Sequence, residues 1–178
     1  RRSSSGASPG LQTLVTMMPD GTSSLFASSN RLALVELGAS GAFLRDELAM
    51  EAPILSESIG SMLWGRRPRT FVLPVLERHV AVVSPASGVE MFEVNGFDLV
   101  SSERYGFDAS ESQIRAAAAD GARLFTCVSN ELHAYFIDPV TQLVTRGPDF
   151  LLPSGHVCQG LAFHEQHYVA TSRRLARV

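Results

Sequence analysis

The chain has 178 residues, 45% of them hydrophobic, which is enough for one domain with a sizeable core. It carries 15 basic and 18 acidic residues and a net charge of −3, so a broadly basic surface is excluded and nucleic acid is not an expected partner. All basic residues are Arg, and the absence of Lys excludes Schiff-base and phosphate-loop lysine chemistry.

The cysteines and the N-terminal residues set further expectations. Cys127 and Cys158 are too few for a disulfide framework, so we expect a fold that does not depend on disulfides. The apolar runs are far shorter than the about 20 residues that span a bilayer, so no membrane partner is expected. Two cysteines and no visible secretion signal favour an intracellular location. Residues 1–10, rich in Arg and Ser, are interpreted as a disordered or linker tail, with a transit peptide as the alternative.

The first predicted elements are antiparallel strands. Apolar runs at 25–27 and 33–35 flank a Ser-Asn turn at 29–30, and an Asp-Gly pair at 20–21 precedes them. Gly, Asn and Asp tolerate the positive φ angles of tight turns. Short apolar runs between such turns predict strands, because no stretch keeps a helical period for three turns.

The same pattern returns along the chain at a fixed interval. Leu132 lies 43 residues after Val89, and Leu175 lies a further 43 residues on. Leu32 lies 57 residues before Val89, so the first interval contains 14 extra residues. We assign these extra residues to an insertion at about 51–69.

Each unit is predicted to contain four strands. In the third unit they are expected at 114–118, 124–128, 132–137 and 143–146. Four strands every 43 residues match the roughly 40–45-residue period of a propeller blade. A β-sandwich is the alternative, but it does not predict turn residues at a fixed interval. The sequence therefore predicts an all-β fold, a partial β-propeller over residues 11–178 with four-stranded antiparallel blades of about 43 residues.

The turn and strand residues also carry a family resemblance. They resemble the blade consensus of YVTN and NHL-type propellers and, more distantly, of WD-repeat proteins, although the Gly-His and Trp-Asp pairs of WD repeats are missing. The matching residues are Pro19-Asp20-Gly21, Leu25-Phe26-Ala27, Asn30, Leu32, Leu34, Asp120-Gly121, Leu124-Phe125, Asn130, Leu132 and Ile137-Asp138-Pro139. The resemblance implies a propeller of about three and a half blades, completed by further blades of the same or another chain, and it identifies no functional residue.

Metal-ligating residue types occur near the C-terminal end of the sequence. They are His156, Cys158, His164 and His167, and their spacing fits no common zinc site. We interpret the histidines as turn residues and Cys158 as a buried thiol. No metal or cofactor is therefore expected.

No catalytic residue is nominated either. Asp20, Asp120 and Asp138 occupy positions where the fold needs turn formers. Ser154-Gly155-His156 does not form a nucleophile elbow.

The insertion supplies the candidate partner-binding residues. Trp64, Arg66, Arg67 and Arg69 combine a large apolar side chain with planar charged groups, which are enriched in binding hot spots. One alternative is a long loop that covers a blade while its Arg side chains stay solvated, and another is that residues are missing from the chain here. Contact with RNA is a weaker third interpretation, since no array of aromatic residues accompanies the Arg.

Two functions follow from these expectations. The first is a non-catalytic protein–protein interaction scaffold within a larger propeller protein or multi-subunit assembly. The second is a lactonase- or quinoprotein-like enzyme with its site in the central channel, which the turn at 137–141 loosely resembles. Fold alone does not choose between them. Polar groups converging at the channel would favour the enzyme, and alanine and aliphatic residues there would favour the scaffold.

Overall fold

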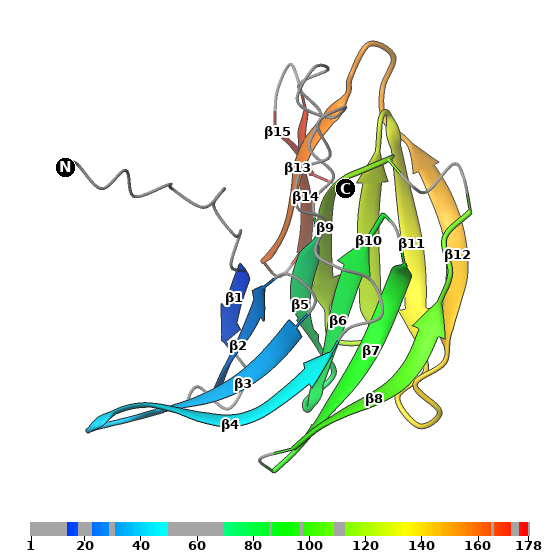
Figure 1. Ribbon diagram of the computed structural model, residues 1–178. Helices are drawn as coiled ribbons and strands as arrows, with labels where there is room; N and C mark the ends of the chain where they lie inside the picture. The colour runs from blue at the N-terminus through cyan, green and yellow to red at the C-terminus, as the bar shows by residue number, and fades with distance from the viewer. Residues whose placement is uncertain are drawn as a thin grey trace, which may run out of the picture.

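The computed structural model describes residues 14–17, 23–28, 31–49, 70–85, 87–96, 98–108, 113–164, 166–171 and 175–177. In these ranges strands form four antiparallel sheets that follow one another along the chain (Figure 1). The first sheet contains β1 (Leu14–Met17), β2 (Ser23–Ser28), β3 (Arg31–Gly38) and β4 (Gly41–Ala49). The second contains β5 (Phe71–Val75), β6 (His79–Ser84), β7 (Gly88–Asn95) and β8 (Asp98–Tyr105).

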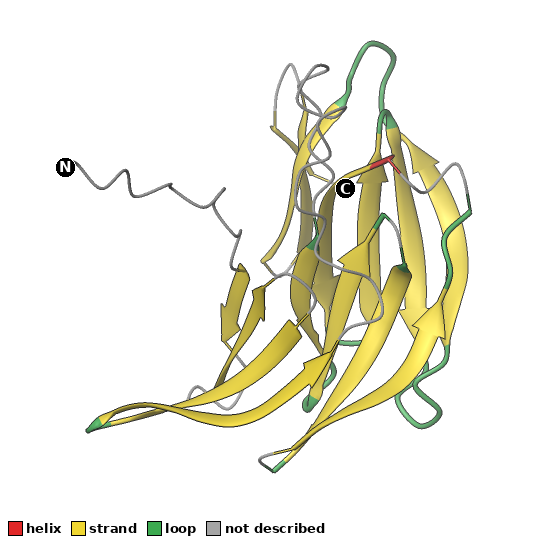
Figure 2. Ribbon diagram, in the orientation of Figure 1, coloured by secondary structure: helices red, strands yellow, loops and turns green. Residues whose placement is uncertain are grey.

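The third sheet contains β9 (Ile114–Asp120), β10 (Arg123–Val128), β11 (Glu131–Ile137) and β12 (Val144–Leu151). The fourth contains β13 (Cys158–His164), β14 (Gln166–Thr171) and β15 (Leu175–Arg177). Strands and the turns between them make up nearly all of the described chain (Figure 2). This confirms the all-β class and the four-stranded antiparallel units that the repeat predicts.

The sheets are arranged side by side through their first strands. β5 contacts both β1 and β9, and β9 also contacts β13. Within each sheet every strand pairs with the next one along the chain, so β4, β8 and β12 form the opposite edges. The sheets therefore fan out from their first strands, which form the inner edges (Figure 1).

The predicted register is present in the structure. Leu32, Val89 and Leu132 are each the second residue of the third strand in their sheet, and each is fully buried. Leu175 begins β15, the third strand of the fourth sheet. The 43-residue repeat thus corresponds to one sheet.

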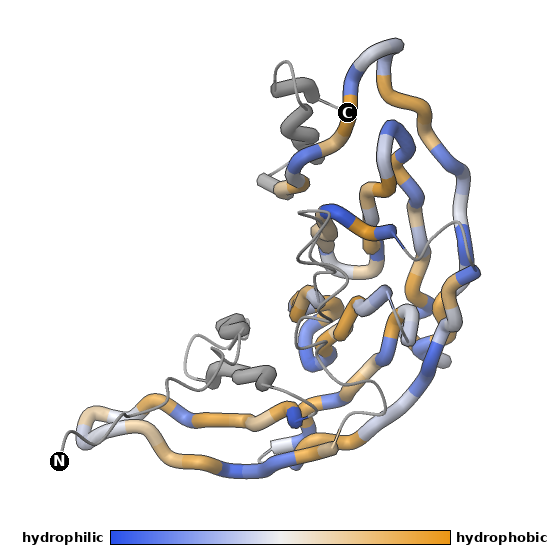
Figure 3. Tube along the Cα trace, turned by 45° about the horizontal axis from the view of Figure 1, so that its top comes forward, coloured by the Kyte–Doolittle hydropathy of each residue, from blue (hydrophilic) through white to orange (hydrophobic). Residues whose placement is uncertain are grey.

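Both faces of the central sheets are buried, because successive strand residues point to opposite faces. In β6, Val80 and Val82 pack with Leu32 of the first sheet. Val83 packs on the other face with Leu124 of the third sheet. Hydrophobic stretches accordingly follow the strands of the four-stranded sheets (Figure 3).

The structure corrects the interpretation of Cys158 as a buried thiol. Cys127 in β10 and Cys158 at the start of β13 form a disulfide, and both side chains are fully buried. The bond links two neighbouring sheets. The interpretation of Cys158 as a thiol is therefore wrong, because the pairing depends on sheet-to-sheet packing, which the cysteine count does not reveal. Among the described residues, no helix is long and apolar enough to cross a membrane.

Candidate functional site

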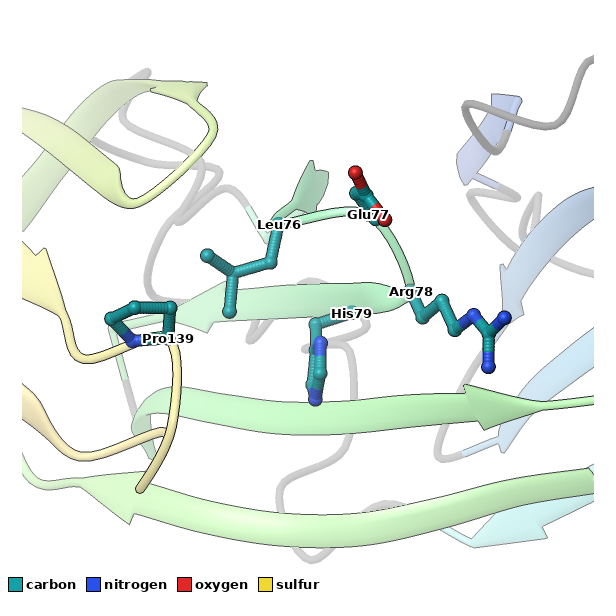
Figure 4. Close-up of a pocket in the computed structure, with 5 residues that line it drawn as sticks. All are labelled: Leu76, Glu77, Arg78, His79 and Pro139. Atoms are coloured by element: carbon teal, nitrogen blue, oxygen red, sulfur yellow. The ribbon is translucent and has the colours of Figure 1, made fainter.

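The candidate site is a cavity of about 420 Å³ between the second and third sheets. Its walls come from the β5–β6 turn and from the loop that joins β11 to β12. The lining residues are Leu76, Glu77, Arg78, His79 and Pro139 (Figure 4).

The wall that contains Pro139 is held by its neighbour Asp138. One carboxylate oxygen of Asp138 accepts hydrogen bonds from the backbone N–H groups of Val140, at 2.9 Å, and Thr141, at 2.7 Å. The Thr141 and Val140 N–H groups, in that order, lower the pKa of Asp138 below its ordinary value of 3.8. The N–H of Asp138 also donates to the Leu143 carbonyl at 3.0 Å, which closes the loop. Asp138 is thus a turn residue, as the sequence predicts.

The opposite wall, formed by the β5–β6 turn, contains an unusual backbone conformation. Leu76 has a φ of 51°, in the left-handed region that bulky residues rarely adopt. Its N–H donates to the Gly121 carbonyl, at 3.0 Å, in the β9–β10 turn of the next sheet. Gly121 also has a positive φ, 61°, and follows the turn former Asp120. One hydrogen bond therefore connects the equivalent turns of two sheets and holds Leu76 beside the cavity.

His79 provides the titratable ring of the site. It is 9% exposed, and neither Nδ1 nor Nε2 has a hydrogen-bond partner. Leu76, His79 and Pro139 enclose one side of the cavity, whereas Arg78 extends away from Pro139 (Figure 4). The cavity is thus lined by two apolar side chains, whereas both ring nitrogens of His79 are buried and unpaired.

Exposed apolar side chains continue from this site along the outer hairpin of the third sheet. Val140, next to Pro139, is 85% exposed, and Leu143 in the same loop is 52% exposed. Phe136 on β11 is also exposed, and its ring lies over Gly147, where any Cβ would clash with it. We call Phe136, Val140 and Leu143 the hairpin patch.

A separate polar network lies on the outer half of the third sheet. Arg146 donates to Asp149 at 2.8 Å, contacts Nδ1 of His133 at 3.1 Å and forms an ion pair with Asp108 at 3.3 Å. Nε2 of the buried His133 lies 3.3 Å from a carboxylate oxygen of Glu131. These mutually paired groups link neighbouring strands. The described part of the chain contains no cluster of His, Cys, Asp or Glu suited to a metal ion.

The partner-binding candidates from the sequence belong to the insertion at about 51–69. Trp64, Arg66, Arg67 and Arg69 lie outside the described residues. The cavity residues were missed because their spacing fits no catalytic motif. The only signal was a polar Glu-Arg-His turn between two apolar runs, which predicts a turn and not a pocket.

Comparison with known proteins identifies the fold. No protein-family model and no curated protein matches the sequence. Among solved structures, the Cps50 (Swd1) β-propeller domain of Myceliophteria thermophila is similar, with a TM-score of 0.68, 11% identity and coverage of 94% of this chain and 54% of that one. A Lactobacillus plantarum protein matches with a TM-score of 0.65, 13% identity and coverage of 92% and 55%, respectively.

A Bacteroides fragilis protein assigned as a candidate 6-phosphogluconolactonase is also similar, with a TM-score of 0.55 and 13% identity. The match covers 94% of this chain and 55% of that one. Identities this low establish the fold alone. The chain has a β-propeller fold and spans about half the length of the solved structures that it matches.

Proposed function

We propose that this chain belongs to a propeller that acts as a non-catalytic protein–protein interaction scaffold, within a larger propeller protein or a multi-subunit assembly. The observation that carries the proposal is the hairpin patch, in which the apolar side chains of Phe136, Val140 and Leu143 are exposed. Burying these side chains against a partner would remove apolar surface from water at about 25 cal/mol per Å². Val140 and Leu143 lie in the loop between β11 and β12, and loops on a rigid scaffold commonly carry binding contacts.

The inner edges of the sheets also support a scaffold. β5 reads Phe-Val-Leu-Pro-Val, and β9 contains four consecutive alanines, Ala116 to Ala119. A lactonase- or quinoprotein-like enzyme needs titratable groups from several blades at the channel. Apart from Arg115 and Asp120 at the two ends of the alanine run, these two inner strands carry aliphatic, aromatic and small residues, which favours the scaffold. The lactonase-like neighbour keeps the enzyme as the alternative.

The test compares two variants by affinity purification and quantitative mass spectrometry. Val140→Asp combined with Leu143→Asp places charge in the hairpin patch, and we expect it to remove specific partners. Leu44→Asp on β4 is the matched control, since Leu44 is 62% exposed but belongs to the first sheet. Thermal melts should show that both variants stay folded. Identical partner lists for the wild type and the Val140/Leu143 variant would contradict the proposal.

A further inference from the structure

The starting observation is the Asn-Gly pair at 95–96, which the sequence contains only once. Asn95 is the last residue of β7, and both residues are exposed. This tip of the β7–β8 hairpin lies at the lower end of the two ribbons in Figure 1. Gly96 has a φ of 63°, and a Cβ built there would meet no heavy atom within 4 Å beyond its chain neighbours. The peptide bond that follows Asn95 is therefore open to solvent.

An asparagine followed by glycine can react with its own backbone, because glycine has no Cβ to block the approach. The Gly96 nitrogen attacks Cγ of Asn95, and the new C–N bond closes a five-membered succinimide ring. The side-chain nitrogen leaves as ammonia and carries away the proton that the backbone nitrogen loses. Water then opens the ring at one of its two carbonyls, which gives either aspartate or isoaspartate. No oxidant, metal or enzyme is needed.

Only the last residue pair of the hairpin has to open for this reaction. The extended backbone of a strand turns the Gly96 nitrogen away from Cγ of Asn95, so the chain must first rotate between them. Asn95 pairs with Asp98, and both residues of this end pair are exposed. Exposed ends of strands open locally at a small cost in free energy, so the reactive conformation is accessible in the folded protein.

The next pair inward is held firmly. It consists of Val94 and Leu99, and both side chains are buried. The Val94 N–H donates to the Arg78 carbonyl at 2.7 Å. The Leu99 N–H donates to Oδ2 of Asp46, on β4 of the first sheet, at 2.6 Å. Local opening is thus confined to the tip of the hairpin.

We infer that Asn95 is a site of spontaneous deamidation, at which the tip of the second sheet acquires a carboxylate as the protein ages. The modification is independent of the proposed scaffold function.

Asn130 provides a matched comparison within the same chain. It is also an exposed turn residue, but the residue that follows it is Glu131. The Glu131 side chain crowds the approach of its own nitrogen to the Asn130 side chain. In addition, the Asn130 carbonyl accepts a hydrogen bond from the Leu152 N–H at 2.8 Å, which ties this turn to the end of β12. We therefore expect Asn130 to stay intact while Asn95 reacts.

Deamidation would change the hairpin next to a contact between two sheets. The new carboxylate at position 95 lies directly opposite Asp98, and like charges in a cross-strand pair repel each other. The isoaspartate form also lengthens the backbone by one carbon, which disturbs the pairing at the tip. Leu99 follows Asp98 and is bonded to Asp46 of the first sheet, so the modified tip should loosen this bond.

The first experiment incubates the folded protein in mildly alkaline buffer made with H₂¹⁸O. Samples are then reduced, digested with trypsin in ordinary water and measured by mass spectrometry. Asn95 and Asn130 fall on separate tryptic peptides, 79–104 and 124–146. We expect progressive loss of unmodified 79–104 and two products of equal mass, aspartate and isoaspartate, that carry one ¹⁸O atom. Deamidation during digestion would not introduce this label.

Two variants test the chemistry and its consequence. Asn95→Gln should stop the mass change, because attack on the longer side chain must close a six-membered ring. Asn95→Asp reproduces the charge of the product. We expect the Leu99 amide to exchange with solvent about two- to five-fold faster in Asn95→Asp than in Asn95→Gln. The Val89 amide, at the other end of β7, is the internal control and should not change.

Two results of the incubation would overturn the inference. One is conversion of Asn95 and Asn130 at equal rates. The other is an unmodified 79–104 peptide in the folded protein while the urea-unfolded protein converts, which would mean that the strand pairing protects Asn95. Equal exchange of the Leu99 amide in the two variants would contradict the predicted loosening at the contact with Asp46.

Discussion

Cys127 on β10 and Cys158 on β13 form a disulfide that joins the third sheet to the fourth, with Cα atoms 6.2 Å apart. The bond closes a chain segment with a sequence separation of 31, and both side chains are fully buried. In the same core cluster lie Ala116, Phe125 and Leu132 of the third sheet, and Leu161 of β13 packs against them, so the bond connects sheets that already share apolar contacts. The fourth sheet is therefore fixed covalently as well as by packing.

Removing this bond should destabilise the fold. We expect Cys127→Ala combined with Cys158→Ala to lower the free energy of unfolding by about 3–4 kcal/mol, because the unfolded chain is no longer constrained by the closed loop. Chemical denaturation of the wild type and the double variant, both without reductant, measures the difference. Thiol labelling of the denatured, unreduced wild type provides the check, and finding two free thiols would contradict the prediction.

The repeat register makes a second prediction about packing. Leu132 is fully buried, and Leu132→Ala should lower the stability by about 2–5 kcal/mol through lost burial and a residual cavity. Leu143→Ala is the matched control, because the Leu143 side chain is exposed and its truncation should change stability by less than about 0.5 kcal/mol. Thermal or urea unfolding compares the two. Equal effects would mean that position 132 is not a core position.

The pH dependence of the β11–β12 loop follows from Asp138. Its pKa is lowered in the folded protein, so the stabilising bonds are complete above the ordinary value of 3.8 and are lost as the pH falls through the lower folded value. We expect the amide protons of Val140 and Thr141 to exchange faster, relative to the rest of the chain, as the pH drops below about 4.

Two substitutions at Asp138 distinguish the contribution of the carboxylate charge from that of the hydrogen-bond acceptor. Asp138→Asn retains an oxygen acceptor and should remove the pH dependence while keeping the loop. Asp138→Ala removes the acceptor, so the protection of these two amides should fall at every pH. Hydrogen exchange followed by NMR measures both variants. Unchanged protection in Asp138→Ala would show that the carboxylate does not hold the loop.

The insertion remains a prediction from the sequence. If residues 51–69 bind a partner, Trp64→Ala combined with Arg66→Glu and Arg67→Glu should weaken partner recovery, because apolar area is lost and charge is reversed.

A matched control exists on β4, where Arg45 lies 5.8 Å from the centre of the Phe43 ring. Phe43→Ala with Arg45→Glu changes an aromatic–arginine pair on a different part of the surface. It therefore shows whether a loss of partner recovery is specific to the insertion or follows from changing any such pair. Affinity purification with mass spectrometry of the complete protein compares the variants. Equal partner lists for the insertion variant and the wild type would remove the insertion, including Arg69, from consideration.

The periodic part of the fold could be read from the sequence. Alternating apolar residues between turn formers define strands, and the spacing of Val89, Leu132 and Leu175 places them in equivalent units. Asp120 and Asp138 were correctly assigned to turns for the same reason. The strands and turns are determined by residues that lie close together in the sequence, so they could be predicted without the tertiary structure.

The candidate site and the disulfide were decided by tertiary structure. Pro139 reaches Leu76 and His79 only because adjacent sheets align their turns, and Cys127 reaches Cys158 only because β10 packs against β13. Neither the pocket nor the disulfide produces a repeating pattern in the sequence, since each depends on contacts between particular residues of neighbouring repeats. The strands and their register are thus properties of the sequence itself, whereas the cavity and the covalent link arise from how the faces of neighbouring sheets meet.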